Sequence, residues 1–146
     1  MALGMDEPPV VMTDVATPVD EAELRRRIEE LNVAVTGYDD GRSLSCFLRD
    51  VVGQLFAGLD GFTWGGYAKV EFLWVAAEHR GRGLGSRLLA AAEREALARG
   101  CGSVVLDTHE FQAPGFYRKH GYTLVGTTLE TPRGYRQFLF QKRLGG

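Results

Sequence analysis

The sequence predicts an α/β (α+β) fold in which helices flank a single mixed β-sheet. Three strand-like segments between residues 44 and 75 are joined by glycine-containing turns, which predicts an antiparallel meander. A helical segment, 83–99, then separates the strand-like segments 67–75 and 103–106. A helix that connects two strands in this way predicts that they are parallel neighbours in one sheet.

The elements before the meander are short. Residues 10–12 form an apolar run that we interpret as a first strand. Within residues 21–31 the apolar side chains recur at helical spacing, which predicts an amphipathic helix. The three arginines at 25–27 lie among glutamates of the same segment, so we interpret them as an ion-paired helix face and not as a polyanion site.

The meander begins with residues 44–48, where apolar and more polar side chains alternate. A glycine-containing turn separates them from the second strand-like segment, 55–64. Gly65 and Gly66 then supply the positive φ angles that a two-residue turn demands, and the third strand, 67–75, follows. These residues predict three consecutive antiparallel strands.

The second half of the chain alternates between helices and strands. After the helix 83–99 and the strand 103–106, residues 113–120 predict a short helix. Two closing strands are predicted at 122–129 and 135–142. The expected element order is therefore βαβββαβαββ.

Composition, net charge and cysteine spacing limit the classes of protein to which the chain can belong. The chain has 146 residues, 45% of them hydrophobic and 25% charged, so we expect one globular domain over residues 1–146. With a net charge of -2 there is no general basic field, and binding of nucleic acid or of a membrane surface is not expected. Cys46 and Cys101 are isolated, which favours neither a disulfide framework nor a zinc site. The first residues do not resemble a signal peptide, so we expect a cytoplasmic protein.

Three glycines, Gly81, Gly83 and Gly85, lie between the strand 67–75 and the following helix. Each weakens a helix by up to ~1 kcal/mol relative to alanine, so their presence at the start of a helix requires another reason. Exposed N–H groups at a helix N-terminus attract anions, and arginines surround this one. The pattern favours a pyrophosphate site over its alternative, a tight turn with arginines in solvent. The arginines are Arg80, Arg82 and Arg87.

Two common phosphate-binding motifs do not match this segment. A Walker A loop needs a lysine after its last glycine, and none is present here. A dinucleotide-binding fingerprint needs G-x-G-x-x-G after the first strand, whereas these glycines follow a meander. Neither an NTPase nor a Rossmann domain is favoured.

Two motifs in this order resemble those of one enzyme family. The residues from Arg80 to Gly85 match [QR]-x-x-G-x-[GA], and those from Phe116 to Tyr122 are similar to Y-x-x-x-G-[FY]. Both motifs are typical of the Gcn5-related (GNAT) N-acetyltransferases. The resemblance spans most of the chain and implies a sheet that is splayed at its centre, the acyl-CoA N-acyltransferase fold.

The resemblance also implies a co-substrate, acetyl-CoA, and no metal. It places the pantetheine arm along the backbone of Leu73, Trp74 and Val75 and makes Tyr117 the general acid that protonates the departing sulfur. Gln112 lies near the same ligand, and Glu110 stands where the family often has asparagine. The pyrophosphate is expected on a run of seven residues, which are Arg80, Gly81, Arg82, Gly83, Leu84, Gly85 and Ser86.

The expected activity is direct transfer of an acetyl group to a primary amine of a small molecule or peptide. The alternative is a GNAT-like module that binds acyl-CoA without turnover. Glu71 lies in an otherwise apolar strand, by alternation on the same face as Leu73 and Val75, and is our first candidate for the general base. Its alternative is an ion pair with a neighbour such as Lys69, or a solvent-facing position.

Other candidates concern the acceptor amine. His109 and Glu110 follow the strand 103–106, so they are further candidates for the base or for binding the amine. Asp39, Asp40 and Trp64 suit a cationic amine and are expected to overhang the splayed strands, although ordinary turn roles are an alternative for each. We also consider a homodimer among the possible assemblies.

Overall fold

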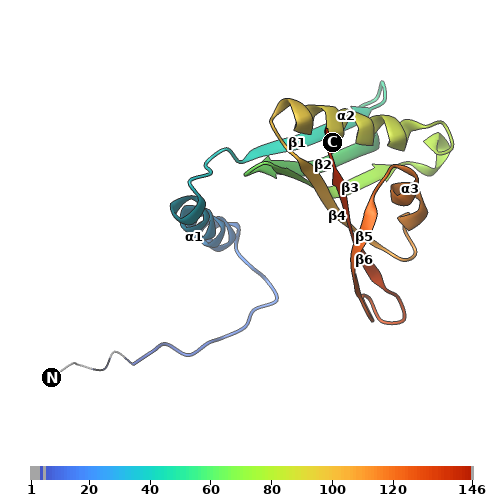
Figure 1. The fold of residues 1–146 in the computed structure, drawn as a ribbon. Helices are drawn as coiled ribbons and strands as arrows, with labels where there is room; N and C mark the ends of the chain where they lie inside the picture. Colours follow the sequence, from blue (N-terminus) through green and yellow to red (C-terminus); the bar gives the residue numbers. More distant parts are fainter. Residues whose placement is uncertain (1–3, 5, 146) are drawn as a thin grey trace. The chain divides into compact units, whose positions relative to one another are not determined.

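The computed structural model describes residue 4 and residues 6–145. The chain divides into two compact units, Met1–Gly37 and Tyr38–Gly146, and each is described by itself (Figure 1). Among the described residues, no helix is long and apolar enough to cross a membrane.

In the described part of the N-terminal unit the helix is α1, which spans Pro18–Thr36. Thr17 caps it, since the Thr17 hydroxyl oxygen accepts a hydrogen bond from the Asp20 N–H, and Gly37 ends it in the left-handed conformation. The helix is longer than expected at both ends. Its arginines form ion pairs one turn away, with Arg26 Nη1 2.6 Å from Glu30 Oε1, which confirms the ion-paired helix face.

The predicted first strand is wrong. Residues 10–12 have no regular secondary structure, and their side chains are exposed. A run of three apolar residues cannot hold a strand conformation unless its backbone groups pair with another strand, and these residues take no part in the sheet.

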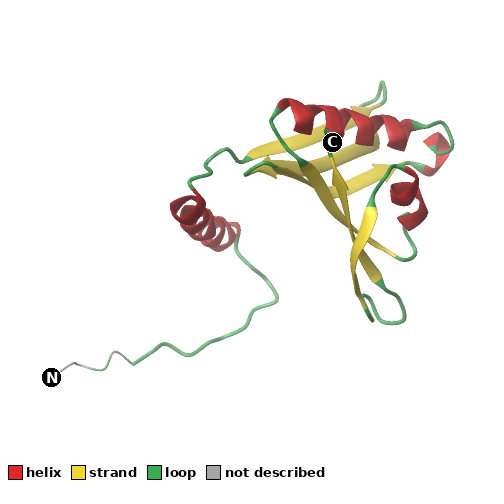
Figure 2. Ribbon diagram, viewed as in Figure 1, coloured by secondary structure: helices red, strands yellow, loops and turns green. Residues whose placement is uncertain are grey.

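The second unit is built on one mixed sheet, as predicted (Figure 2). Its strands lie in the spatial order β1-β2-β3-β4-β6-β5. Every neighbouring pair is antiparallel except β3 and β4, which are parallel because α2 connects them. The strands are β1 (Arg42–Arg49), β2 (Leu55–Trp64), β3 (Tyr67–Val75), β4 (Ser103–His109), β5 (Thr123–Thr128) and β6 (Gln137–Arg143).

Two helices of this unit pack against one face of the sheet. The helix α2 (Leu84–Ala98) contributes Leu89, Ala92 and Ala96 to the core, and α3 (Pro114–Lys119) contributes Tyr117. A short 3-10 helix, η1 (Ala77–His79), lies between β3 and α2. The core is continuous from β1 to β6, so the helices and the sheet form two layers that pack around one core.

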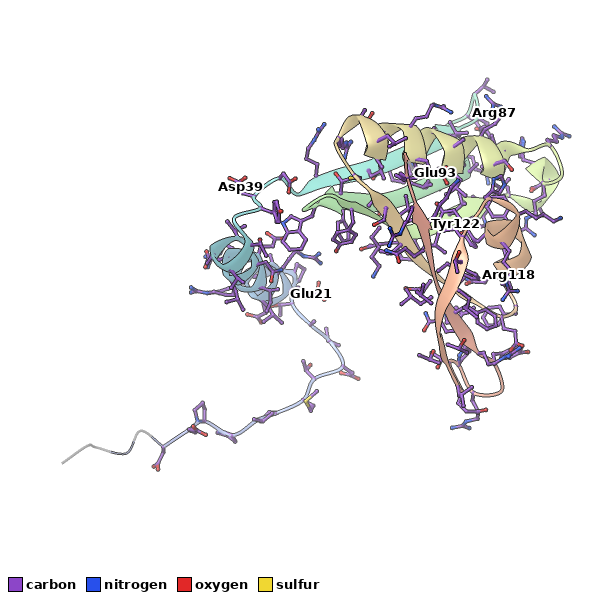
Figure 3. All side chains as sticks on the ribbon, viewed as in Figure 1. Glu21, Asp39, Arg87, Glu93, Arg118 and Tyr122 are labelled. Atoms are coloured by element: carbon purple, nitrogen blue, oxygen red, sulfur yellow. The ribbon has the colours of Figure 1, made fainter. Side chains whose placement is uncertain are left out.

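A polar contact joins α2 to Tyr122, the residue before β5, and to the last strand. The Tyr122 hydroxyl donates a hydrogen bond of 2.9 Å to Glu93 Oε1 of α2, and Lys142 Nζ of β6 lies 3.0 Å from Glu93 Oε2. Figure 3 labels Glu93 and Tyr122, which point toward each other. Because the carboxylate is largely buried, this contact sets the position of α2 over the sheet.

The central parallel pair is short. Strand β3 pairs with β4 only from Tyr67↔Ser103 to Val70↔Leu106, although β3 continues to Val75 and β4 to His109. Beyond that point β3 remains paired with β2, and β4 remains paired with β6. The two strands therefore separate at the centre of the sheet, as the sequence resemblance implied.

A β-bulge marks the same point. The register of β2 and β3 shifts between the pairs Asp60↔Phe72 and Gly61↔Val70, which leaves Glu71 as the extra residue of β3. The bulge requires glycine opposite it, because a Cβ atom at Gly61 would overlap the backbone carbonyl oxygen of Lys69. The bulge and the separation of β3 from β4 together create the space in which the candidate site lies.

Candidate active site at the separated strands

A concave opening of about 830 Å³ lies where β3 and β4 separate. It contains eleven of the twelve residues expected to bind the coenzyme, all but Arg82, and both residues expected to act in catalysis. Its walls are the end of β3, the first turn of α2, the end of β4 and the start of α3. The expected residues that line it are Glu71, Leu73, Trp74, Val75, Arg80, Gly81, Gly83, Leu84, Gly85, Ser86, Gln112 and Tyr117.

The glycine-containing turn supplies unpaired N–H groups to this opening. Gly83 is the N-cap of α2 with φ 73°, and no side chain caps the helix. The first N–H groups of a helix have no partner within it, and here they belong to Leu84, Gly85 and Ser86. Added to the helix dipole, these donors make the start of α2 a place for an anion.

Arg80 joins this turn to the end of β3. Its Nε atom donates a hydrogen bond of 2.9 Å to the Val75 carbonyl oxygen, so the guanidinium group is held at the edge of the opening. A guanidinium held in place offers its remaining N–H groups to a phosphate. The arrangement fits a pyrophosphate between Arg80 and α2.

The free edge of β3 also presents backbone donors. Ala76 N–H donates to the Phe56 carbonyl oxygen of β2. Because successive residues of a strand direct their N–H groups to opposite edges, those of Leu73 and Val75 point to the edge that faces β4, where pairing has ended. This edge can pair with an extended, amide-containing ligand.

Tyr117 reaches the opening from the core. The residue is 7% exposed, and its ring packs against Tyr122 and Phe140. Burial raises the pKa of the Tyr117 phenol above its ordinary value, and the negative charge of Asp107 adds to this shift. No described residue accepts a hydrogen bond from its hydroxyl group. The phenol is therefore a buried, protonated donor at the edge of the opening.

Comparison with known proteins agrees with this geometry. Residues 12–122 match the model of the acetyltransferase (GNAT) family. The chain belongs to the GNAT acetyltransferases. This membership confirms the fold, the acetyltransferase class and the resemblance of the two motifs.

Individual GNAT proteins are similar over different lengths. The blasticidin-S acetyltransferase of Streptomyces morookaense is 43% identical over 93 residues, which cover 63% of this chain and 68% of that protein. The crystal structure of an acetyltransferase from Bacillus cereus is 30% identical with a TM-score of 0.76, and covers 92% of this chain and 98% of that one. A Bacillus anthracis structure in complex with acetyl coenzyme A is 22% identical with a TM-score of 0.55, over 62% and 57% of the two chains, and shows the shared fold.

The bulge changes the expected orientation of Glu71 in this GNAT chain. Alternation predicted that Glu71 would share a face with Leu73 and Val75, and this is wrong because the extra residue breaks the alternation. Leu73 packs against the core on the helical side, whereas Glu71 and Phe72 are exposed. Among the described residues Glu71 has no hydrogen bond or ion pair. The alternative, an ion pair between Glu71 and Lys69, is therefore absent from the described structure.

The loop between β4 and α3 is held by its own Gln112 and by Arg136, which precedes β6. Gln112 Oε1 accepts a hydrogen bond of 2.7 Å from the His109 N–H, and Arg136 Nη2 lies 2.6 Å from Glu110 Oε1. The hydrogen bonds from Arg136 lower the pKa of the Glu110 carboxyl. His109 and Glu110 lie beside the opening without lining it, and their roles toward an acceptor stay predictions.

Asp39, Asp40 and Trp64 lie elsewhere. Trp64 ends β2 at the turn into β3, at the opposite end of β3 from Val75. There Asp40 Oδ1 accepts a hydrogen bond from the Gly65 N–H, and Trp64 Nε1 donates one to the Tyr38 carbonyl oxygen. These residues do not overhang the opening, because a two-residue turn places them at the far end of the strand. Any role in acceptor binding stays a prediction.

Several lining residues were not singled out from the sequence. Phe116 directly precedes Tyr117 in the second motif, so its position could have been found from that motif. Asp107 is an exposed position between the buried residues Leu106 and Thr108 of β4, Phe111 follows the end of β4, and Phe72 follows the bulge. The sequence signal for Asp107, Phe111 and Phe72 is weak, because only the pairing of the strands shows that these residues line the opening. The additional lining residues are Val70, Phe72, His79, Asp107, Thr108, Phe111 and Phe116.

Proposed function

We propose that the protein is an acetyl-CoA-dependent N-acetyltransferase that transfers the acetyl group directly to a primary amine of a small molecule. One observation carries this proposal: the uncapped start of α2, the free edge of β3 and the Tyr117 hydroxyl all meet in one opening. The name of the blasticidin-S acetyltransferase supports a small-molecule acceptor.

The residues fit the three parts of the coenzyme. The N–H groups of Leu84, Gly85 and Ser86 would bind the pyrophosphate with Arg80. Gly81 and Gly83 have positive φ and open space where a side chain would project, so the backbone there is accessible to phosphate oxygens. The edge of β3 would pair with the amides of the pantetheine arm.

The chemistry needs an electrophilic carbonyl, a deprotonated amine and a proton for sulfur. An N–H group from the free edge of β3, such as that of Val75, would stabilise the negative charge that develops on the acetyl oxygen. Glu71 would remove a proton from the attacking amine, directly or through a water molecule. Attack of the amine would form the C–N bond and leave the charge on the oxygen; as this intermediate collapses, the C–S bond would break and Tyr117 would donate its phenolic proton to the departing thiolate.

The two proposed proton-transfer groups reach the opening from different sides of the sheet. Tyr117 comes from the helical side, where α2 and α3 pack, and Glu71 is on the exposed side. This separation suits a reaction in which the acceptor amine would approach the acetyl carbon from the side of Glu71, while Tyr117 would face the sulfur that leaves.

A turnover assay with the purified full chain tests the proposal. Acetyl-CoA is supplied with polyamines, aminoglycosides, amino acids or short peptides, free thiol release is followed, and the product mass is measured. We expect thiol release that depends on the acceptor and a mass gain of one acetyl group. Binding of coenzyme A without acceptor-dependent thiol release for any amine would instead indicate a binding module.

A further inference from the structure

An exposed aromatic ring forms part of the wall of the opening. Phe111 lies in the loop between β4 and α3 and is 55% exposed, although it lines a concave site. Large apolar side chains that are exposed in a cleft commonly mark a binding surface. Neither the proposed proton transfers nor the proposed phosphate contacts use this ring.

The ring of Phe111 is supported by two neighbouring rings. His109 stacks against it with a centroid distance of 5.2 Å and an interplanar angle of 5°. Tyr135 packs edge to face at 5.0 Å and 77°. His109 is itself fixed, since its Nδ1 atom lies 2.9 Å from the Thr131 carbonyl oxygen. We refer to Phe111, His109 and Tyr135 as the ring platform.

The two segments that carry the platform, the start of the β4–α3 loop and the residues before β6, are tied to each other. The Glu110 N–H donates to the Arg136 carbonyl oxygen, and the Arg136 N–H donates to Glu110 Oε2. The same two residues form the ion pair described above. Because Glu110, which precedes Phe111, is bonded to Arg136, which follows Tyr135, a ligand that stacks on Phe111 does not have to order the ring first.

Carboxylates and a further aromatic ring also line the opening. Phe72, 68% exposed, and Glu71 come from the bulge of β3, and Asp107 comes from β4. A ligand that lies between β3 and the platform therefore meets aromatic faces and negative charge together. This combination attracts a cationic amine that also carries a flat ring.

We infer that the acceptor is a cationic amine joined to an aromatic ring, and that this ring stacks on Phe111 of the platform. The inference rests on the proposed function and goes further by naming the acceptor class and the residue that selects it. The ring packs against Phe111 while the ammonium group reaches the side of Glu71 and Asp107. An aromatic pair adds ~0.5–1.5 kcal/mol beyond area burial.

The test compares two amines of equal charge and similar size, 2-phenylethylamine and 2-cyclohexylethylamine. Each is titrated by calorimetry into the full chain saturated with coenzyme A, and each is also assayed for turnover with acetyl-CoA. The variants are Phe111→Leu and, as a matched control, Phe47→Leu. Phe47 is an exposed phenylalanine of β1 that does not line the opening.

We expect the wild type and Phe47→Leu to bind the aromatic amine about 2- to 10-fold more tightly than the saturated one, the range that corresponds to one aromatic pair. In Phe111→Leu the two affinities should become equal. Equal affinities in the wild type, or a preference that survives in Phe111→Leu, would overturn the inference. Selective binding without turnover of either amine would support the platform and count against the proposed function.

Discussion

The Ser86 hydroxyl oxygen lies 2.9 Å from His120 Nε2, and this hydrogen bond joins the first turn of α2 to the C-terminal end of α3. Phe116 strengthens the junction, because its ring packs on His120 at 4.6 Å and lies over Gly85. The proposed phosphate site and the helix that carries Tyr117 are therefore in direct contact.

This contact predicts coupling between coenzyme binding and the position of Tyr117. Ser86→Ala and His120→Ala should each lower kcat/KM, and the double variant should lose little more than the more damaged single variant. Coupling of ~0.5–3 kcal/mol is usual for residues in contact. Steady-state kinetics of the four proteins give the value. Purely additive losses would mean that the hydrogen bond does not link the two helices, and a partial recovery in His120→Gln would favour the link.

The bulge at Glu71 predicts a strict requirement at Gly61. In Gly61→Ala the new Cβ atom would overlap the Lys69 carbonyl oxygen, so the variant should lose ~1–3 kcal/mol in free energy of unfolding and lose activity. Thermal or urea unfolding measures the change. Gly126→Ala in β5 is the control, since its Cβ atom would make only an ordinary contact with Leu139. Equal stability of the two variants would show that the bulge tolerates a side chain.

Tyr117→Phe should retain coenzyme affinity and lower kcat by ~10²–10⁴-fold, because the ring remains and the proton donor is lost. Burial raises the pKa of the phenol above its ordinary value of 10.0, so Tyr117 stays protonated throughout the neutral range. Below about pH 10, deprotonation of Tyr117 should therefore cause no fall in the wild-type rate. Any fall in rate in that range should also occur in Tyr117→Phe. A variant with the wild-type rate would reduce Tyr117 to a packing residue.

Glu71→Gln should lower kcat/KM at neutral pH by roughly 10²-fold if the carboxylate accepts the amine proton. Part of the loss should be recovered as pH rises toward the pKa of the acceptor, because the amine then arrives without its extra proton. The pH profile of kcat/KM measures this recovery. Glu78→Gln, at an exposed position of η1 outside the opening, should keep the wild-type profile. A normal rate in Glu71→Gln would move the proton transfer to another group.

The fold of the second unit could be predicted because its signals are local. Gly65 and Gly66 specify the turn of the meander, and the helical stripe after Gly83 specifies the crossover that makes β3 and β4 parallel. The coenzyme residues could be predicted for the same reason, because the motif that starts at Arg80 and the motif that starts at Phe116 each occupy one continuous stretch of sequence. Both motifs flank the same opening.

The remaining features depend on pairing between distant segments. Residues 10–12 resemble a strand locally, and only the absence of a partner strand shows that they are not one. The bulge at Glu71 arises from the register of β2 against β3, which leaves no pattern in β3 itself. Trp64 pairs with Tyr67 at the start of β3, so the length of β3 separates it from Val75 and from the opening at which it is predicted. The ring platform joins His109 to Tyr135, which belong to different elements.

The proposed function depends on binding of the pyrophosphate of coenzyme A at the start of α2, and a calorimetric titration of coenzyme A tests this binding. Gly83→Asp adds a negative charge beside the proposed phosphate. Gly83→Asn adds the same bulk at the same positive φ without charge, and Gly53→Asp places the charge at a glycine of similar φ in the β1–β2 turn. We expect Gly53→Asp to bind as the wild type does, and Gly83→Asp to bind at least ~10-fold more weakly than Gly83→Asn, about the value of one charge-assisted hydrogen bond. Equal affinities of folded Gly83→Asp and Gly83→Asn would contradict the claim.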